Sequence, residues 1–96
     1  MSMRQAYIDK IQARLNEWDA EIEKLTAQAD EAGADAKIRY EKQVDDLKKR
    51  QKEAQLKLDD MRKAGEDAWD DMKAGVEDAW KSLEKGIKDA TSRFAA

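Results

Sequence analysis

The chain of 96 residues contains no cysteine, no histidine and no proline, and it has only four glycines. Without cysteine there are no disulfides and no thiolate metal ligands. Without histidine the commonest general base and a common zinc ligand are also missing. We therefore expect no catalytic residue, no metal site and no cofactor, and the sequence predicts a protein that is not an enzyme. The absence of proline favours long, uninterrupted helices.

A long hydrophobic run is missing as well. No apolar segment approaches the roughly 18 residues that a transmembrane helix requires. The first residues, MSMRQAYIDK, carry Arg4, Asp9 and Lys10 where a signal peptide would need an apolar stretch. We therefore expect a soluble, cytoplasmic protein.

Charge is what the sequence has in abundance, since 43% of the residues are charged while the net charge is only −3. Residues 1–33 hold four basic and seven acidic side chains, a net of −3, whereas residues 34–63 hold ten and seven, a net of +3. Residues 64–96 hold five and eight, again a net of −3. This alternation favours a middle segment that lies against both others. The one basic run, KKRQK at 48–52, has acidic neighbours, so we expect no nucleic-acid binding.

Apolar residues recur at alternating spacings of three and four, the heptad pattern of packed helices. The pattern predicts a first helix at residues 2–31 and a short turn at 31–35, where Gly33 tolerates a left-handed cap and Asp35 can cap the next helix. A second ladder follows at once. Two helices joined by a short turn form an antiparallel hairpin. The two ladders are Ile8, Ile11, Leu15, Trp18, Ile22, Leu25, Ala29 and Ala32, and Ala36, Tyr40, Val44, Leu47, Gln51, Ala54, Leu58, Met61 and Gly65.

After Met61 the repeat lengthens to eleven residues. The phrase EDAW occurs at 66–69 and again at 77–80, and Gly75 is followed by Gly86. Eleven residues make about three helical turns, so each side chain type returns to the same face of a nearly straight helix. The segment is therefore expected to present one apolar face along its whole length.

This face has a bulky edge at Trp69, Trp80 and Ile87 and a hollow edge at Gly75 and Gly86, where a second backbone or a neighbour's indole can approach. We predict that Trp18, Trp69 and Trp80 are buried in helix contacts, and that large side chains at the two glycines disrupt assembly. The face is the candidate interaction surface, which consists of Trp69, Met72, Gly75, Val76, Ala79, Trp80, Leu83, Gly86, Ile87, Ala90 and Phe94.

Two architectures are compatible with one all-α domain over residues 1–96. In the preferred one, the hairpin is a coiled coil whose long second helix spans 35–94, with at most a kink or turn at 64–66, because the apolar ladder runs through this region without a skip. In the alternative, the chain turns near Gly65 and forms a three-helix bundle. RKAGEDA at 62–68 resembles DEAGADA at 30–36, which supports the second turn.

Three segments, QAYIDKIQARLNEWDAEIEKL, ADAKIRYEKQVDDL and GEDAWDDMKAGVEDAWKSLEKGIKDATSRF, resemble a family of small bacterial coiled-coil proteins known as stress-response proteins after a cyanobacterial member. The tandem DAW phrases and the closing SRF are the most specific part of the resemblance. It implies a bacterial protein linked to stress and assigns no reaction.

Two functions follow as expectations. The preferred one is a structural or interaction protein that forms a homo-oligomer, because a long second helix would leave the candidate interaction surface open to solvent. The alternative is a peripheral amphipathic helix that coats a lipid or storage-granule surface, since eleven-residue repeats also occur in exchangeable apolipoproteins. Acidic residues flank the apolar face, which argues against an anionic membrane but not against neutral lipid.

Overall fold

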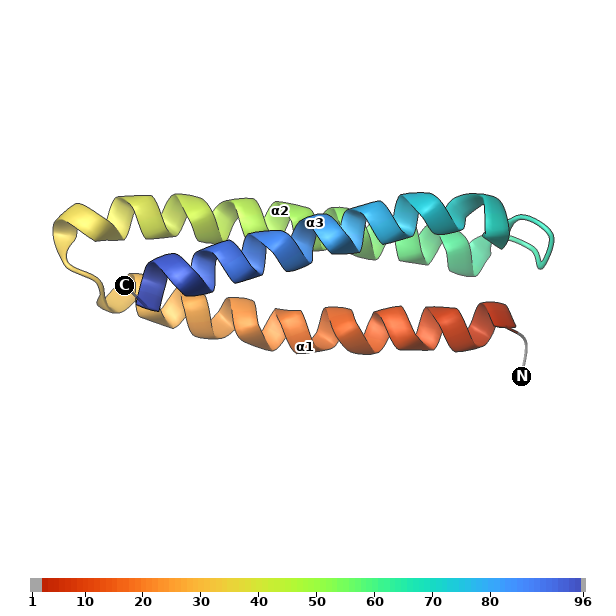
Figure 1. Ribbon diagram of the computed structural model, residues 1–96, viewed down its shortest axis with the longest axis horizontal. Helices are drawn as coiled ribbons and strands as arrows, with labels where there is room; N and C mark the ends of the chain where they lie inside the picture. The colour runs from red at the N-terminus through yellow and green to blue at the C-terminus, as the bar shows by residue number, and fades with distance from the viewer. Residues whose placement is uncertain (1–2, 96) are drawn as a thin grey trace.

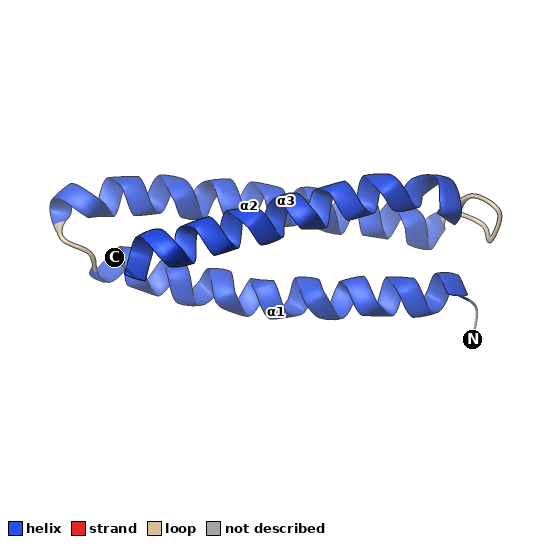
Figure 2. Cartoon of the chain, viewed as in Figure 1, coloured by secondary structure: helices blue, strands red, loops and turns tan. Residues whose placement is uncertain are grey.

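The protein is an up-down-up bundle of three helices in the computed structural model, which describes residues 3–95 (Figure 1). Helix α1 spans Met3–Glu31, α2 spans Ala34–Lys63 and α3 spans Trp69–Ala95. The bundle is 51 Å long and 18 by 17 Å across. Consecutive helices run antiparallel, so α1 and α3 are parallel, and the end of α3 lies near the end of α1 (Figure 1). Figure 2 shows helix everywhere in this region except at the two turns.

The all-α class and the first helix are as predicted, but the preferred continuous second helix is wrong. Helix α2 ends at Lys63, and residues 64–68 turn the chain back so that α3 packs on α1 and α2. Gly65 and Ala68, which the ladder placed on the apolar face, are exposed in the turn. The unbroken ladder shows which residues would share a face in a straight helix, but it does not prevent a break. Folding back buries the apolar face of α3 within one chain.

The first turn is two residues long, Ala32 and Gly33, close to the predicted 31–35. The backbone conformation of this turn differs from the prediction, because Gly33 has φ −62° and ψ 159°, which is extended rather than left-handed. Asp35 does not cap α2 and instead lies in its first turn, where a carboxylate favours the positive end of the helix dipole. Ser2, the predicted first residue of the first helix, lies outside the described residues.

The core runs along the bundle axis and consists of apolar residues from all three helices. Among the described residues no polar or charged side chain is buried. The predicted heptad positions supply most of the core, which consists of Ile8, Ile11, Leu15, Ile22, Leu25 and Ala29 from α1, Val44, Leu47, Ala54, Leu58 and Met61 from α2, and Val76, Ala79, Leu83, Ile87 and Ala90 from α3. Heptad spacing thus predicted which side of α1 and α2 faces inward.

Side-chain hydrogen bonds outnumber ion pairs among the polar contacts between helices of the described residues. Gln12 of α1 and Gln55 of α2 exchange two hydrogen bonds, of 3.0 and 2.8 Å. Gln51 donates to Asp19 Oδ1 at 2.7 Å. Most ion pairs of the described residues join side chains three or four apart on one helix, which contribute only about 0.3–0.5 kcal/mol each. The charge alternation along the chain therefore contributes little through direct contacts.

Candidate functional site

The candidate interaction surface of α3 faces the inside of the bundle. Six of its residues are buried, namely Val76, Ala79, Leu83, Gly86, Ile87 and Ala90, and the other five are half-buried. Helices α1 and α2 of the same chain cover the face that the long-helix architecture would have left open. Within residues 3–95 this apolar stripe of α3 is therefore not open to solvent, and it gives no reason for oligomerisation.

The bulky edge of α3 packs on α1 through two pairs of aromatic rings. Trp69 lies 5.9 Å from Tyr7 between ring centroids, and Trp80 stacks on Trp18 at 5.5 Å. Tyr7 and Trp18 are themselves eleven residues apart, like Trp69 and Trp80. Because α1 and α3 are parallel, equal spacing brings both pairs into register. The eleven-residue repeat of α3 is thus matched by one aromatic repeat in α1.

The three tryptophans take part in helix contacts as predicted, although all of them are half-buried rather than buried. Trp80 Nε1 is shielded from solvent and has no hydrogen-bond partner in the part of the chain that the structure describes. An unpaired donor of this kind costs about 1–3 kcal/mol. The α1–α3 seam is therefore stabilised by ring contact and weakened at one buried N–H group.

A small polar cluster surrounds the Tyr7–Trp69 pair. The Lys73 ammonium lies 5.2 Å from the Tyr7 ring centroid and 5.5 Å from that of Trp69, within the range of cation–π attraction. The Tyr7 hydroxyl donates to Glu77 Oε1 at 3.5 Å. Burial, followed by the charge of Glu77 and this hydrogen bond, raises the pKa of Tyr7 to about 12. The phenol therefore stays protonated well above its usual range.

The hollow edge of α3 faces α2, and its two glycines differ. A Cβ atom at Gly86 would lie 2.7 Å from Leu47 Cδ2 and 3.0 Å from Arg50 Nη1, so this glycine permits the close approach of α2. A Cβ atom at Gly75 would meet nothing within 4 Å. The predicted indole does not fill the hollow, since the side chains of Leu47 and Arg50 occupy it at Gly86.

The connection between α2 and α3 departs from helical geometry over a very short stretch. Ala64 is extended, with φ −73° and ψ 149°, and its N–H still donates to Asp60 and Met61 oxygens at the end of α2. From Gly65 the backbone turns again, because the Ala68 N–H donates to Gly65 O at 3.1 Å. No described residue of the chain has a positive φ. The two helices are thus separated chiefly by the conformation of Ala64 and Gly65.

Arg4 of α1 holds this connection in place. Its guanidinium donates to the carbonyl oxygens of Met61 and Arg62 at 3.4 and 3.3 Å. It also pairs with Glu66 at 3.3 Å. One side chain therefore donates to two carbonyl oxygens in the last turn of α2 and links them to the turn.

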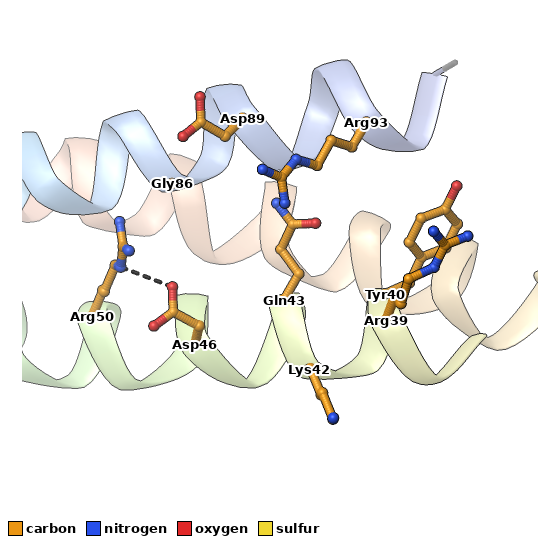
Figure 3. Close-up of a pocket in the computed structure, with 9 residues that line it drawn as sticks. All are labelled: Arg39, Tyr40, Lys42, Gln43, Asp46, Arg50, Gly86, Asp89 and Arg93. Carbon is orange, nitrogen blue, oxygen red and sulfur yellow. Dashed lines mark ion pairs between the residues drawn. The ribbon is translucent and has the colours of Figure 1, made fainter. Parts of the chain in front are cut away.

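An open groove of about 830 Å³ lies between α2 and α3, near the start of α2 and the end of α3 (Figure 3). Gly86 forms part of its wall, and the tilted ring pair Tyr40–Phe94, with centroids 4.1 Å apart, joins the two helices there. The groove is lined by four basic and two acidic side chains: Arg39, Lys42, Arg50 and Arg93, with Asp46 and Asp89. It is a polar groove with a local charge opposite to that of the whole chain.

Sequence reasoning missed Tyr7, Arg4 and the groove. The eleven-residue spacing of Tyr7 and Trp18 is a signal that could have paired α1 with α3. No such signal exists for the groove, because Arg39 and Arg93 are 54 positions apart in the sequence and come together only when the chain turns at Ala64.

Within residues 3–95 no group of three or more histidine, cysteine, aspartate or glutamate side chains is placed to hold a metal ion. None of the described helices combines the length and the apolar character needed to cross a membrane. No family model, curated protein or solved structure matches the chain. The resemblance to bacterial stress-response proteins therefore stays a prediction.

Proposed function

We propose that the protein is a non-enzymatic interaction protein that self-associates by exchanging α3 between two copies. The link to bacterial stress is part of the proposal and follows from the family resemblance alone. The observation that carries self-association is the connection at 64–68, where two long helices are separated mainly by the backbone of Ala64 and Gly65.

The connection contains only one residue that disfavours a helix, Gly65. It reads Ala-Gly-Glu-Asp-Ala, with no proline, and the Asp71 N–H already donates to Ala68 O at 3.2 Å. A change of Ala64 and Gly65 to helical geometry would join α2 to α3. The apolar ladder passes through 58, 61, 65, 68 and 72 without a skip, so the apolar faces of both helices would then lie on one side.

A second copy is the partner that fits an extended α3. Once α3 leaves its own bundle, side chains such as Met72, Val76 and Leu83 lose their cover, at about 1.5–3 kcal/mol for each large apolar side chain. The α1–α2 groove of a second copy, vacated in the same way, provides the same contacts. Reciprocal exchange gives a closed twofold dimer with the interfaces of the monomer, so only the turn and the entropy of association differ.

Substitutions at Gly65 test this proposal. Alanine favours helical geometry over glycine by about 0.5–1 kcal/mol, and two connections straighten per dimer, so Gly65→Ala is expected to tighten dimerisation roughly tenfold. Gly65→Pro is expected to prevent it, because the residue before proline avoids the helical region and Ala64 is already extended. The hydrogen bonds of the connection use the N–H groups of Ala64 and Ala68, not that of Gly65.

Light scattering over a concentration series measures the effect. Gly33→Ala is the matched control, because Gly33 also follows an alanine in a turn, and a Cβ atom at this position would meet nothing within 4 Å. It is expected to leave the dimer fraction unchanged. Wild-type protein and Gly65→Ala that both stay monomeric at high micromolar concentration would contradict self-association.

Exchange itself is tested by cross-linking, for which a cysteine-free chain is well suited. Arg50 Nη1 donates to Ser82 O at 3.0 Å, so an arginine side chain spans the distance between these positions, and a bismaleimide of similar reach can link cysteines placed there. After a chain with Arg50→Cys is unfolded and refolded with a chain carrying Ser82→Cys, exchange predicts a mixed cross-linked dimer. Gly65→Pro in both chains should abolish it. A dimer without this cross-link would indicate association through another surface.

A second candidate function also requires α3 to leave its own bundle. Its partner would be a neutral lipid or storage-granule surface. The observation that favours it is the segregation of α3, whose buried face is apolar while Asp70, Asp71 and Lys81 are exposed on the other sides. Flotation with neutral-lipid droplets tests it. Flotation of wild-type protein that is lost in Gly65→Pro would favour coating, and wild-type protein that remains with the aqueous fraction would exclude it.

A further inference from the structure

We propose that the groove between α2 and α3 binds an anion that carries several linked phosphate groups. The groove has about 830 Å³ of space and is open to solvent along the bundle surface (Figure 3). Of its charged lining residues, four are basic and two are acidic, on a chain whose net charge is −3. The inference is independent of α3 exchange, because an exchanged dimer would form the same groove from two chains.

Two arginines on opposite walls carry the argument. Arg39 belongs to α2 and Arg93 to the last turn of α3, and neither guanidinium has a hydrogen bond or an ion pair within residues 3–95. Figure 3 shows Arg93 extending from α3 toward Gln43 of α2. A guanidinium offers two parallel N–H groups that match two phosphate oxygens. An anion between the walls would thus bridge two cations and receive the Gln43 amide as a third donor.

A third arginine, Arg50, lies further along α2 in the same groove, where Asp46 offsets its charge. Arg50 is fixed by Asp46, whose Oδ2 lies 2.9 Å from its Nε, and by the Ser82 carbonyl, 3.0 Å from its Nη1. Gly86 leaves the room for it, since a Cβ atom there would lie 3.0 Å from Arg50 Nη1. From Arg39 to Arg50 the helix rises by about 16 Å, which is too far for one phosphate to span. The spacing therefore favours a chain of phosphates.

The acidic side chains of the groove do not oppose this binding equally. Asp46 and Arg50 offset each other's charge, so the net positive charge comes from Arg39 and Arg93, and Asp89 points away from α2 in Figure 3. Lys42 also points away from the groove, so it adds only to the surrounding potential. The space between Arg39, Gln43 and Arg93 is consequently positive, and no carboxylate side chain of residues 3–95 occupies it.

Two sources share this chemistry, an inorganic polyphosphate and a nucleoside triphosphate. Titration with inorganic tripolyphosphate and with adenosine triphosphate, followed by the amide signal of Gly86 in NMR spectra, distinguishes them. Equal affinity would indicate that the phosphates alone are recognised, whereas tighter binding of the nucleotide would add a contact to its ring or sugar. No shift with either probe at low salt would overturn the proposal.

Two double variants distinguish binding in the groove from attraction of the anion by the overall charge of the protein. Arg39→Gln with Arg93→Gln is expected to weaken tripolyphosphate binding at least about tenfold, because two charge-assisted contacts are lost. Lys24→Gln with Lys49→Gln is the control, since it removes the same charge from exposed lysines outside the groove. Equal weakening by both pairs would mean that net charge alone attracts the anion, and would refute the groove. All four side chains are exposed, so circular dichroism should show unchanged folding.

Discussion

Helix α3 packs on α1 and on α2 in opposite ways, with large side chains toward α1 and a missing side chain toward α2. Toward the parallel helix α1, large rings repeat at intervals of eleven and meet rings with the same interval, as Trp69 and Trp80 meet Tyr7 and Trp18. Toward the antiparallel helix α2, a missing side chain at Gly86 admits Leu47 and Arg50. One sequence period thus serves two neighbours, because it keeps one bulky and one hollow edge in line along α3.

The two glycines of the hollow edge differ in how closely α2 approaches them. Gly75 and Gly86 are one repeat apart and lie on the same edge, yet only Gly86 is approached closely by α2. Beside Gly75 the structure leaves a shallow hollow of about 200 Å³ next to Met72 and Val76. The repeat fixes the direction that a residue faces, while the distance to the neighbouring helix is decided by the side chains of that neighbour.

The largest effect is expected when this difference between the glycines is tested directly. Gly86→Leu should destabilise the bundle, because overpacking costs about 1–3 kcal/mol and its Cβ atom alone would lie 2.7 Å from the buried Leu47 Cδ2. This exceeds the gain of up to about 1 kcal/mol in helix propensity. Gly75→Leu has that gain without a clash and should leave stability unchanged or raise it. Urea denaturation followed by circular dichroism measures both.

One result for Gly75→Leu and Gly86→Leu would contradict the close approach of α2 at Gly86. If Gly75→Leu and Gly86→Leu shift the urea midpoint equally, α2 does not approach α3 closely at Gly86. A change in the slope of the transition rather than its midpoint would instead indicate an effect on the unfolded or native ensemble. Gly86→Ala offers an intermediate step, since even one carbon would meet Leu47 Cδ2 at 2.7 Å.

The bulky side is tested by a double-mutant cycle on its stacked pair. Trp18→Ala, Trp80→Ala and the double variant should give a coupling energy of about 0.5–1.5 kcal/mol, the usual contribution of an aromatic pair beyond its buried area. The two rings stack at 5.5 Å with an interplanar angle of 26°. Urea denaturation of the four proteins provides the measurement.

A control double-mutant cycle uses two aromatic residues that pack on different partners. Trp18 with Phe94 should show coupling near zero, because Phe94 packs on Tyr40 of α2 at the far edge of the groove. If Trp18 and Trp80 were equally uncoupled, the α1–α3 seam would not be held by ring contact. The match between the two eleven-residue spacings would then be coincidental.

The heptad spacing of α1 and α2 predicts their inward faces, because a period near 3.5 residues leaves one stripe that must be covered by another helix. The eleven-residue spacing likewise predicts which residues of α3 share a face. What covers that face is not encoded locally. In this structure α1 and α2 of the same chain cover Val76 and Leu83 because the chain turns at 64–68, a segment whose composition does not exclude a helix.

Glycine is also a weaker signal here than it first appears in the sequence. The turn composition predicts a left-handed conformation for Gly33, but at φ −62° any residue can occupy its place. The groove could not be predicted for a different reason. Its arginines come from distant segments, and only the turn at 64–68 brings Arg93 of α3 over Gln43 of α2. Such sites depend on the tertiary arrangement rather than on a motif.

The smallest expected effect concerns pH and again distinguishes the two sides, since it arises at Tyr7 on the α1 side. The pKa of this phenol is raised from 10.0 to about 12, by burial and then by the charge and hydrogen bond of Glu77. Below pH 10 the folded and unfolded chains both hold the proton, and the contribution to stability is complete. Between about pH 10 and pH 12 the unfolded chain loses its proton first, so stability falls as pH rises.

Tyr7→Phe keeps the ring against Trp69 and removes only this titration. The urea midpoint of the wild-type protein should therefore decline more steeply above pH 10 than that of the variant, and the two should run parallel below it. Comparison of the two proteins cancels the groups that they share, including Lys73 above the ring. The difference in tyrosinate absorbance between them reports the same ionisation in the folded state. A midpoint near pH 10 in that difference would show that Tyr7 is not shielded by α3. It would contradict the packing of Tyr7 against Lys73 and Glu77.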